Sequence, residues 1–379
     1  MIMSFELSII EYCLLGALAI VLLCELYFYI RYIGGVLYVR KQTEEAPTPP
    51  VTVIVCARNE FANLEHYLQA LLTQNYPEYE VIVVDDGSGD GSREVIEAYM
   101  RQDARLRMTF VPRDARMYST KKLGLTLAAK AAKYDYLLLT DADCRPESKN
   151  WIRTMMAGFA QPEKQIVLGY GAYFREPGVL NTIIRFDTLF NGLHYLGAAV
   201  ARHPYMGVGR NLAYRKDMFF SSGGFSHLMT ERSGDDDLLV NHVVNRNNTA
   251  VVVEQESVTW SLANTRLKDW LQQKRRHLSV SPRYSKVSKL RLAIEPMMRA
   301  AFYLLLIAVA VLMGPLGWIA AAGAYLLRLF VQLLMLNLGA HKLNQPAIRL
   351  EIIWLDIFLP LLSLYILTTQ PLFKKNMRW

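Results

Sequence analysis

The chain has 379 residues, with 42 Lys+Arg against 34 Asp+Glu, and hydrophobic residues make up 52% of it. This composition excludes a disordered or fibrous protein, and four cysteines without a CxxC pair exclude a disulfide-stapled scaffold or a zinc site. Charged residues are spread through residues 40–296, whereas residues 300–327 contain none. We therefore expect one globular region flanked by membrane segments.

The first apolar segment lies in residues 1–40, as a transmembrane helix at about residues 12–30 followed by a linker. Its only charge is Glu25, and a stretch of this length can cross a bilayer. The basic residues Arg31 and Arg40 follow the helix. By the positive-inside tendency, the region after them is cytoplasmic.

Residues 297–379 contain three further apolar segments, at about residues 297–314, 317–338 and 352–370. Three spans leaving a cytoplasmic domain would put the basic residues Lys374, Lys375 and Arg378 outside, against the positive-inside tendency. Either the last segment, which contains Asp356 and Pro360, is re-entrant or interfacial, or the tendency fails here.

Arg328 stands in the middle of an apolar run. An arginine at membrane depth is costly and is by default a candidate functional residue, here for a lipid phosphate. The alternatives are that it snorkels to the interface or pairs with Asp356.

The middle region alternates β-branched runs with helical stretches. We expect strands at residues 51–55, 81–84, 136–140 and 166–170, and helices near residues 63–72, 92–101 and 121–132. Strands that alternate with helices predict an α/β domain with a mostly parallel sheet.

Polar clusters follow three of these strands: Arg58–Glu60, Asp85–Ser88 and Asp141–Asp143. Ligands of open α/β sheets bind outside the carboxyl ends of the strands, so the clusters are expected to meet in one crevice. Asp141 and Asp143 would lie on one side of an extended segment and suit Mg²⁺ or Mn²⁺ on a diphosphate. A solvated turn or a helix cap is the alternative.

Lys121 and Lys122 begin the helix at residues 121–132, where they could meet phosphates or simply face solvent. The acidic run Asp235, Asp236 and Asp237 precedes another apolar helical stretch. It either caps that helix or, because crowded carboxylates raise one another's pKa, supplies a general base.

Residues 266–296 are expected to form an amphipathic region at the membrane surface. Trp270 would anchor it there, while Lys274, Arg275 and Arg276 meet lipid headgroups or a diphosphate. The basic excess lies beside membrane segments, so nucleic acid is not an expected partner.

The order of these motifs resembles the family 2 glycosyltransferases of the GT-A fold, over residues 48–285. The resemblance implies a cytoplasmic GT-A catalytic domain at residues 41–265 and transfer of a sugar from a nucleotide-diphosphate donor. It also suggests a membrane-bound enzyme of bacterial type, in the inner membrane.

The resemblance further implies roles for individual residues. Asp236, with Asp235 and Asp237 as alternatives in register, would be the base of an inverting displacement, and Asp141 and Asp143 would hold Mg²⁺ or Mn²⁺. The nucleotide sugar would contact Ala57, Arg58, Asn59, Glu60, Asp85, Asp86, Lys121, Lys122 and Asp141. Gln273, Arg276 and His277 would contact the diphosphate and the acceptor.

His277 stands where the family pattern has a tryptophan that packs against a growing sugar chain. Its presence, with few membrane segments, favours non-processive transfer to a membrane lipid or a lipid-linked acceptor. A processive polysaccharide synthase is the first alternative, and an inactive membrane scaffold of the same fold is the second.

Overall fold

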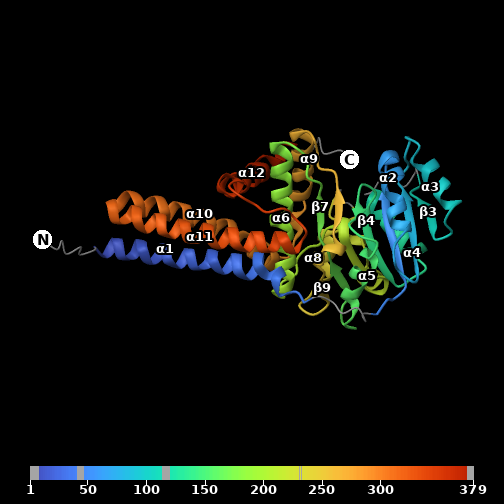
Figure 1. Cartoon of the computed structure of the whole chain (residues 1–379), viewed down its shortest axis with the longest axis horizontal. Helices are drawn as coiled ribbons and strands as arrows, with labels where there is room; N and C mark the ends of the chain where they lie inside the picture. The colour runs from blue at the N-terminus through green and yellow to red at the C-terminus, as the bar shows by residue number, and fades with distance from the viewer. Residues whose placement is uncertain (1–7, 41–46, 113–119, 230, 232, 374–379) are drawn as a thin grey trace.

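The computed structural model describes residues 8–40, 47–112, 120–229, 231 and 233–373. In Figure 1, an α/β domain occupies one side of the molecule, and a bundle of long helices projects from the other. Helix α6 (Val179–Val200) stands between the two parts.

The main sheet has seven strands in the order β3-β2-β1-β4-β8-β6-β9. Strands β3, β2, β1 and β4 are parallel to one another, whereas β8 is antiparallel to both β4 and β6, and β9 is parallel to β6. The strands are β1 (Val51–Ala57), β2 (Tyr79–Asp85), β3 (Leu106–Phe110), β4 (Tyr136–Asp141), β6 (Ile166–Leu168), β8 (Leu212–Arg215) and β9 (Thr249–Val251). The predicted mostly parallel sheet is confirmed, and β3, β8 and β9 are additional strands.

Both faces of the sheet are buried, which explains why its central strands are continuous apolar runs. Along β1, Val53 and Val55 pack in one hydrophobic core with α2 and α5, while Ile54 packs in a second core with α4 and α6. The covering helices are α2 (Phe61–Leu72), α3 (Ser92–Met100), α4 (Thr120–Ala131) and α5 (Trp151–Met156).

The remainder of the domain is built from short elements. A second sheet has the order β5-β10-β7. Its strands are Arg145–Pro146, Thr259–Ser261 and Gly171–Tyr173, in that order, and the short helices are α7 (Lys216–Ser221) and α8 (Asp237–Val243).

The backbone of helix α6 lies directly against the backbone of the segment that follows helix α1 (Ile9–Phe28). A Cβ atom added to Gly197 would lie 1.6 Å from the carbonyl oxygen of Tyr32, and one added to Gly35 would lie 2.8 Å from Gly197 Cα. Only glycine permits such an approach. The α/β domain is therefore joined closely to the N-terminal helix, which continues through one π turn (Tyr29–Ile33) and one 3₁₀ turn (Gly34–Tyr38).

Four helices are long and apolar enough to cross a membrane. They are α1 (Ile9–Phe28, with its continuation to Tyr38), α10 (Lys286–Leu312), α11 (Gly314–Lys342) and α12 (Glu351–Phe373). Figure 1 shows α1, α10 and α11 side by side. Exposed leucine and isoleucine side chains cover their outer faces, as expected for surfaces in lipid.

The expected segment boundaries need correction. Helix α10 begins at Lys286 rather than at 297, so residues 266–296 are not one interfacial element but α9 (Leu267–Leu278), a 3₁₀ turn (Ser281–Arg283) and the start of α10. Trp270 is only 2% exposed and packs in the core of the domain, so it is not a membrane anchor. Helix α12 is continuous, and Lys374, Lys375 and Arg378 lie outside the described residues.

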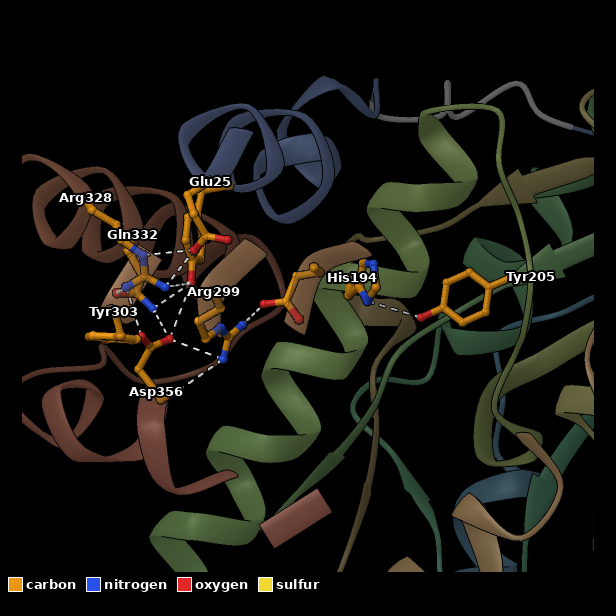
Figure 2. Close-up of polar contacts among 10 residues, drawn as sticks. Glu25, His194, Tyr205, Arg299, Tyr303, Arg328, Gln332 and Asp356 are labelled. Carbon is orange, nitrogen blue, oxygen red and sulfur yellow. Dashed lines mark hydrogen bonds and ion pairs between the residues drawn. The ribbon is translucent and has the colours of Figure 1, made fainter. Parts of the chain in front are cut away.

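Arg328 is the centre of a buried polar cluster that joins the apolar helices (Figure 2). Its guanidinium lies 2.8 Å from Glu25 Oε2 of α1 and 2.9 Å from Asp356 Oδ2 of α12. It also donates to the Tyr29 hydroxyl. Arg328 is 1% exposed, so it pairs within the protein and does not present its charge to a lipid phosphate.

Asp356 collects further donors from two helices. It accepts hydrogen bonds from Tyr303 of α10 (2.7 Å) and Gln332 of α11 (2.7 Å), and it forms an ion pair with Arg299 of α10 (3.3 Å). Charges that pair with one another can be buried in an apolar bundle, whereas a single buried charge costs much more free energy. The cluster therefore fixes the packing of α1, α10, α11 and α12.

We predict that Arg328→Met destabilises the protein by about 3–5 kcal/mol, because Glu25 and Asp356 would keep their buried charges without the shared cation. Unfolding in detergent, followed by circular dichroism, measures the loss. Arg349→Met, at an exposed arginine of the loop before α12, is the control and should change little. Equal stability of both variants would contradict a structural role for the cluster.

Candidate active site

The register of the sheet brings three of the predicted clusters to one edge. Ala57 at the end of β1 pairs with Asp85 at the end of β2, and Cys56 pairs with Asp141 at the end of β4. The segments that follow these strands therefore begin side by side, as the sequence predicted. This edge is the candidate active site.

The loop after β1 is held against the loop after β2 by hydrogen bonds. Asn59 adopts a left-handed backbone (φ 56°), its N–H donates to Ser88 Oγ (3.0 Å), and its side-chain oxygen accepts from Gly89 N–H (2.9 Å). The Asp85 carboxylate accepts a hydrogen bond from Ser88 N–H (2.9 Å), and Arg58 Nη1 lies 3.4 Å from Asp86 Oδ2. The predicted nucleotide-binding residues are thus brought together, and several of them brace the loops themselves.

Glu60 lies at the start of α2 in the same loop pair. Its N–H donates to Ser92 Oγ (2.9 Å), and its carboxylate accepts from Asn63 (2.6 Å). Burial, with the nearby charges of Asp143 and Asp141 as smaller causes, raises the pKa of Glu60. Glu60 is therefore close enough to the two carboxylates at the end of β4 to feel their charge.

Lys121 connects two of the acidic motifs. Its ammonium nitrogen lies 3.0 Å from Asp141 Oδ1 and 3.0 Å from Asp235 Oδ2. Burial opposes its charge, but the attraction of Asp141 and Asp235 holds the pKa of Lys121 well above its usual value. The acidic run thus lies directly beside the aspartates at the end of β4.

Lys122 has a different position. It is fully buried, and its ammonium donates to the carbonyl oxygens of Glu231 and Ser233, each at 2.6 Å. Burial lowers the pKa of Lys122. Its contacts hold the segment that leads into the acidic run, so of the two lysines only Lys121 reaches the carboxylates of the crevice.

Asp141 and Asp143 lie close enough to repel. Burial, and next the charge of Asp141, raise the pKa of Asp143. Arg210 offsets part of this effect, and its own guanidinium is held by the carbonyl of Gly171 (3.0 Å) and by stacking over Tyr173 (4.3 Å). Arg210 is a charged residue of the crevice that sequence reasoning missed, and it lies in the glycine-rich segment Met206–Asn211.

The three aspartates of the acidic run have different partners. Asp235 forms an ion pair with Lys121. Burial alone would raise the pKa of Asp235, but the charge of Lys121 outweighs burial and the pKa is lowered. Asp237 is buried and accepts from the Tyr284 hydroxyl (2.8 Å) and from Leu238 N–H (2.8 Å).

Asp236 lies between these two and remains partly accessible. Its two oxygens accept from Gly209 N–H and Asp237 N–H, each at 2.8 Å. Burial, and next the charge of Asp235, raise the pKa of Asp236. Asp236 therefore combines a carboxylate held in place with a raised pKa and access to the crevice.

Helix α9 closes another side of the crevice. Gln273 donates to the Tyr173 hydroxyl (3.3 Å), which places it beside the ring that carries Arg210. Lys274 pairs with Asp187 of α6 at 2.8 Å and so ties α9 to that helix. Arg276 and the exposed His277 follow on α9.

Comparison with known proteins agrees with this geometry. Residues 52–222 match the family model described as "Glycosyl transferase family 2". Residues 52–222 therefore carry the sequence of a family 2 glycosyltransferase domain. The acidic run and α9 lie beyond the matched residues, so the roles of Asp236, Gln273, Arg276 and His277 remain predictions.

Two curated relatives of this glycosyltransferase domain carry related names. "Glycosyltransferase GlyG" of Streptococcus pneumoniae is 29% identical over 31% of this chain and 38% of its own length. "Glycosyltransferase AglE" of Haloferax volcanii is 27% identical over 48% of this chain and 58% of its own length. The match thus spans between about two fifths and three fifths of the length of these relatives.

A solved structure shares the fold over nearly its whole length. Mannosyltransferase PcManGT from Pyrobaculum calidifontis, solved in complex with GDP-Man and Mn²⁺, superposes with a TM-score of 0.55 and 19% identity. The superposition covers 88% of this chain and 99% of that one. It confirms the predicted GT-A fold of the family 2 domain.

We predict that the stability of Asp237→Asn depends less on pH than that of the unaltered protein. Burial, with Asp236 as the next cause, raises the pKa of Asp237 to about 8. Since the unfolded value is about 3.9, folding loses stability as this carboxyl ionises between the two values.

Unfolding temperatures at about pH 5 and about pH 9 test this prediction. The difference between the variant and the unaltered protein should move in favour of the variant as the pH rises. Asp269→Asn, which removes an exposed carboxylate on α9, is the control. A difference that stays constant with pH would show that Asp237 is not the titrating group.

Proposed function

We propose that the protein transfers one sugar from a nucleotide-diphosphate donor to a membrane lipid or a lipid-linked acceptor, with inversion at the sugar carbon. The observation that carries the proposal is the bridge from Lys121 to both Asp141 and Asp235. It joins the carboxylates suited to a donor diphosphate to those suited to an acceptor. Donor and acceptor groups could then meet in one crevice.

The residues at the end of β4 fit a divalent cation. Asp141 and Asp143 offer hard oxygen ligands, and their mutual repulsion, which contributes to the raised pKa of Asp143, would be relieved by Mg²⁺ or Mn²⁺. The cation would neutralise charge on the diphosphate leaving group. Water and the donor would complete the coordination.

Asp236 is proposed as the base. It would take the proton of the acceptor hydroxyl while the oxygen forms a bond to the sugar carbon and the bond from that carbon to the diphosphate breaks. The nucleoside diphosphate then leaves, and Lys121 and Arg210 supply positive charge near it. The hydrogen bonds from Gly209 and Asp237 keep the Asp236 carboxylate in one orientation, and its raised pKa suits a base.

The position of the domain supports a membrane acceptor. Helix α9 packs against α12, and α6 contacts both the sheet and α11, so the crevice is built beside four helices that are long and apolar enough to cross a membrane. Arg31 and Arg40 follow α1, which favours a cytoplasmic catalytic domain in a bacterial inner membrane. Without a tryptophan at position 277, transfer of a single sugar is favoured over chain extension.

The test is nucleotide release by the full-length protein in detergent. A panel of nucleotide sugars that includes GDP-mannose and UDP-GlcNAc is supplied with Mn²⁺ or Mg²⁺ and a total membrane lipid extract. We expect release from one donor, dependent on the extract, with one sugar added per acceptor. Products with several sugars would instead support the processive alternative.

Asp236→Asn should abolish transfer while the donor still binds, because the amide keeps the shape of the side chain and cannot take a proton. Turnover is measured in the release assay, and donor affinity is measured by calorimetry. Asp217→Asn, at an exposed aspartate paired with Arg215, is the control. Full activity of Asp236→Asn would remove Asp236 as the base.

Asp143→Ala should weaken donor binding in the presence of Mn²⁺ and bring it close to the affinity measured with a chelator. Without the cation, the two proteins should differ little, because the proposed role of Asp143 is to hold the metal. Calorimetric titration of the nucleotide sugar with and without Mn²⁺ measures both states. The same metal dependence in both proteins would exclude Asp143 as a ligand.

A further inference from the structure

A cavity of about 410 Å³ lies between α1, α6 and α10, and the carboxylates proposed for catalysis are not among its lining residues. Its wall is mainly apolar and includes Leu23, Phe28, Ala198, Leu292, Ile294 and Met298. Ligand sites typically combine such walls with a few convergent polar groups. Its volume lies within the range of small-molecule binding sites, and no step of the proposed reaction uses the cavity.

The cavity reaches the surface of helices that are suited to lie in lipid. Tyr27 of α1 and Ile294 of α10 line it, and they are 61% and 49% exposed. Both helices are candidate membrane spans. An occupant that enters between them would come from the bilayer, which favours a hydrocarbon chain over a water-soluble ligand.

Positive charge gathers at one part of the cavity. Arg291 and His203 line it, and the Tyr32 hydroxyl lies 3.2 Å from His203 Nδ1. Two carboxylates, Glu25 and Glu295, also line the cavity, but they are paired with Arg328 and Arg299 and not with Arg291. Burial, and next the charges of Arg291, Arg246 and Arg31, lower the pKa of His203, so all three arginines are near. In the part of the chain that the structure describes, none of the three is in an ion pair with a carboxylate. An anionic group is the complementary partner for such a cluster.

The cavity is also connected to the acidic run. Tyr205 lines it and lies 3.4 Å from His194 Nδ1 (Figure 2). The ring of Tyr205 packs against Tyr284, with 6.4 Å between centroids, and Tyr284 donates to Asp237. Two packed tyrosines therefore separate the cavity from the neighbour of Asp236.

We propose that this cavity binds the hydrocarbon chain of a lipid acceptor that carries a phosphate group, with the phosphate at Arg291 and His203. The inference rests on the proposed function and makes it more specific, since it names the acceptor class and the site that draws it from the bilayer. Phosphate suits the arginines, and the chain suits the apolar wall. Tyr205 and Tyr284 connect the wall of the cavity to Asp237, the neighbour of the proposed base.

Photolabelling of the full-length protein in phosphatidylcholine nanodiscs tests the site. The probe is hexadecyl phosphate with a diazirine in the middle of its chain, and labelled peptides are located by mass spectrometry. We expect labels on the segments of α1 and α10 that line the cavity. Leu292→Trp and Ala198→Trp should fill the cavity and reduce this labelling about tenfold, a loss of affinity of about 1.4 kcal/mol.

Leu304→Trp is the matched control, because it places the same side chain on the exposed face of α10, where Leu304 is 68% exposed. Labelling should persist in this variant. The proposal would be overturned if the labels spread evenly over the outer faces of α10 and α11 and did not change in the two variants that fill the cavity. Two filled variants on different helices guard against the misfolding of either.

The head group is tested separately with hexadecanol that carries the same diazirine. Arg291→Gln should reduce labelling by the phosphate probe and leave labelling by the alcohol unchanged. Equal labelling by both probes in the unaltered protein, insensitive to Arg291→Gln, would overturn the assignment of phosphate.

Donor binding separates failure of this inference from failure of the proposed function. Leu292→Trp should lose lipid-dependent transfer yet bind the nucleotide sugar as before. If the cavity is labelled but no nucleotide sugar binds to the unaltered protein, the transferase proposal fails and the lipid site stands. If Leu292→Trp loses the label and transfers normally, the cavity does not hold the acceptor.

Discussion

The ion cluster around Arg328 is the interaction on which the arrangement of the four long apolar helices depends. A guanidinium buried among apolar helices is tolerable only when carboxylates and hydroxyl groups surround it. Glu25, Asp356 and Tyr29 come from opposite ends of the chain, so the cluster can form only after the N-terminal and C-terminal helices have met. Once α1 is placed, its continuation contacts α6, and α6 supports the sheet. The polar contacts in the bundle thus connect, through α1 and α6, to the position of the α/β domain.

Much of the fold was predictable because the central strands are buried on both faces. Residues 51–55 and 81–84 are β-branched runs, which strongly favour a strand over a helix. In the structure both runs lie within longer strands, at residues 51–57 and 79–85. Strands β3 and β8 were missed because they are short and mix polar with apolar residues. Helix α6 was missed for another reason. It is covered on one side by the sheet and on another by the bundle, so its sequence lacks a single apolar stripe.

Those parts of the candidate site that depend on local sequence and strand order could be predicted. Strand order places Asp85 and Asp141 at one edge, and this can be inferred from alternating strands and helices. The partners of Lys121 and Lys122 could not be inferred, since adjacent residues on a helix point in different directions and their partners lie far along the chain. Trp270 shows the same limit. A tryptophan before a basic helix suits an interface, but its burial depends on tertiary packing.

The contact between Gly197 and Tyr32 has a geometric consequence for the whole protein. Where backbone meets backbone, no side chain can change rotamer to absorb a shift, so α6 and the end of α1 have little freedom to slide or tilt against each other. Helix α6 carries Asp187, which holds α9 through Lys274. The height of the crevice above the helices of the bundle is therefore fixed by a backbone contact and not by adjustable side chains. A substrate of the kind proposed, anchored among those helices, would meet the carboxylates at a fixed reach, and the length of its polar end would become a criterion for selection.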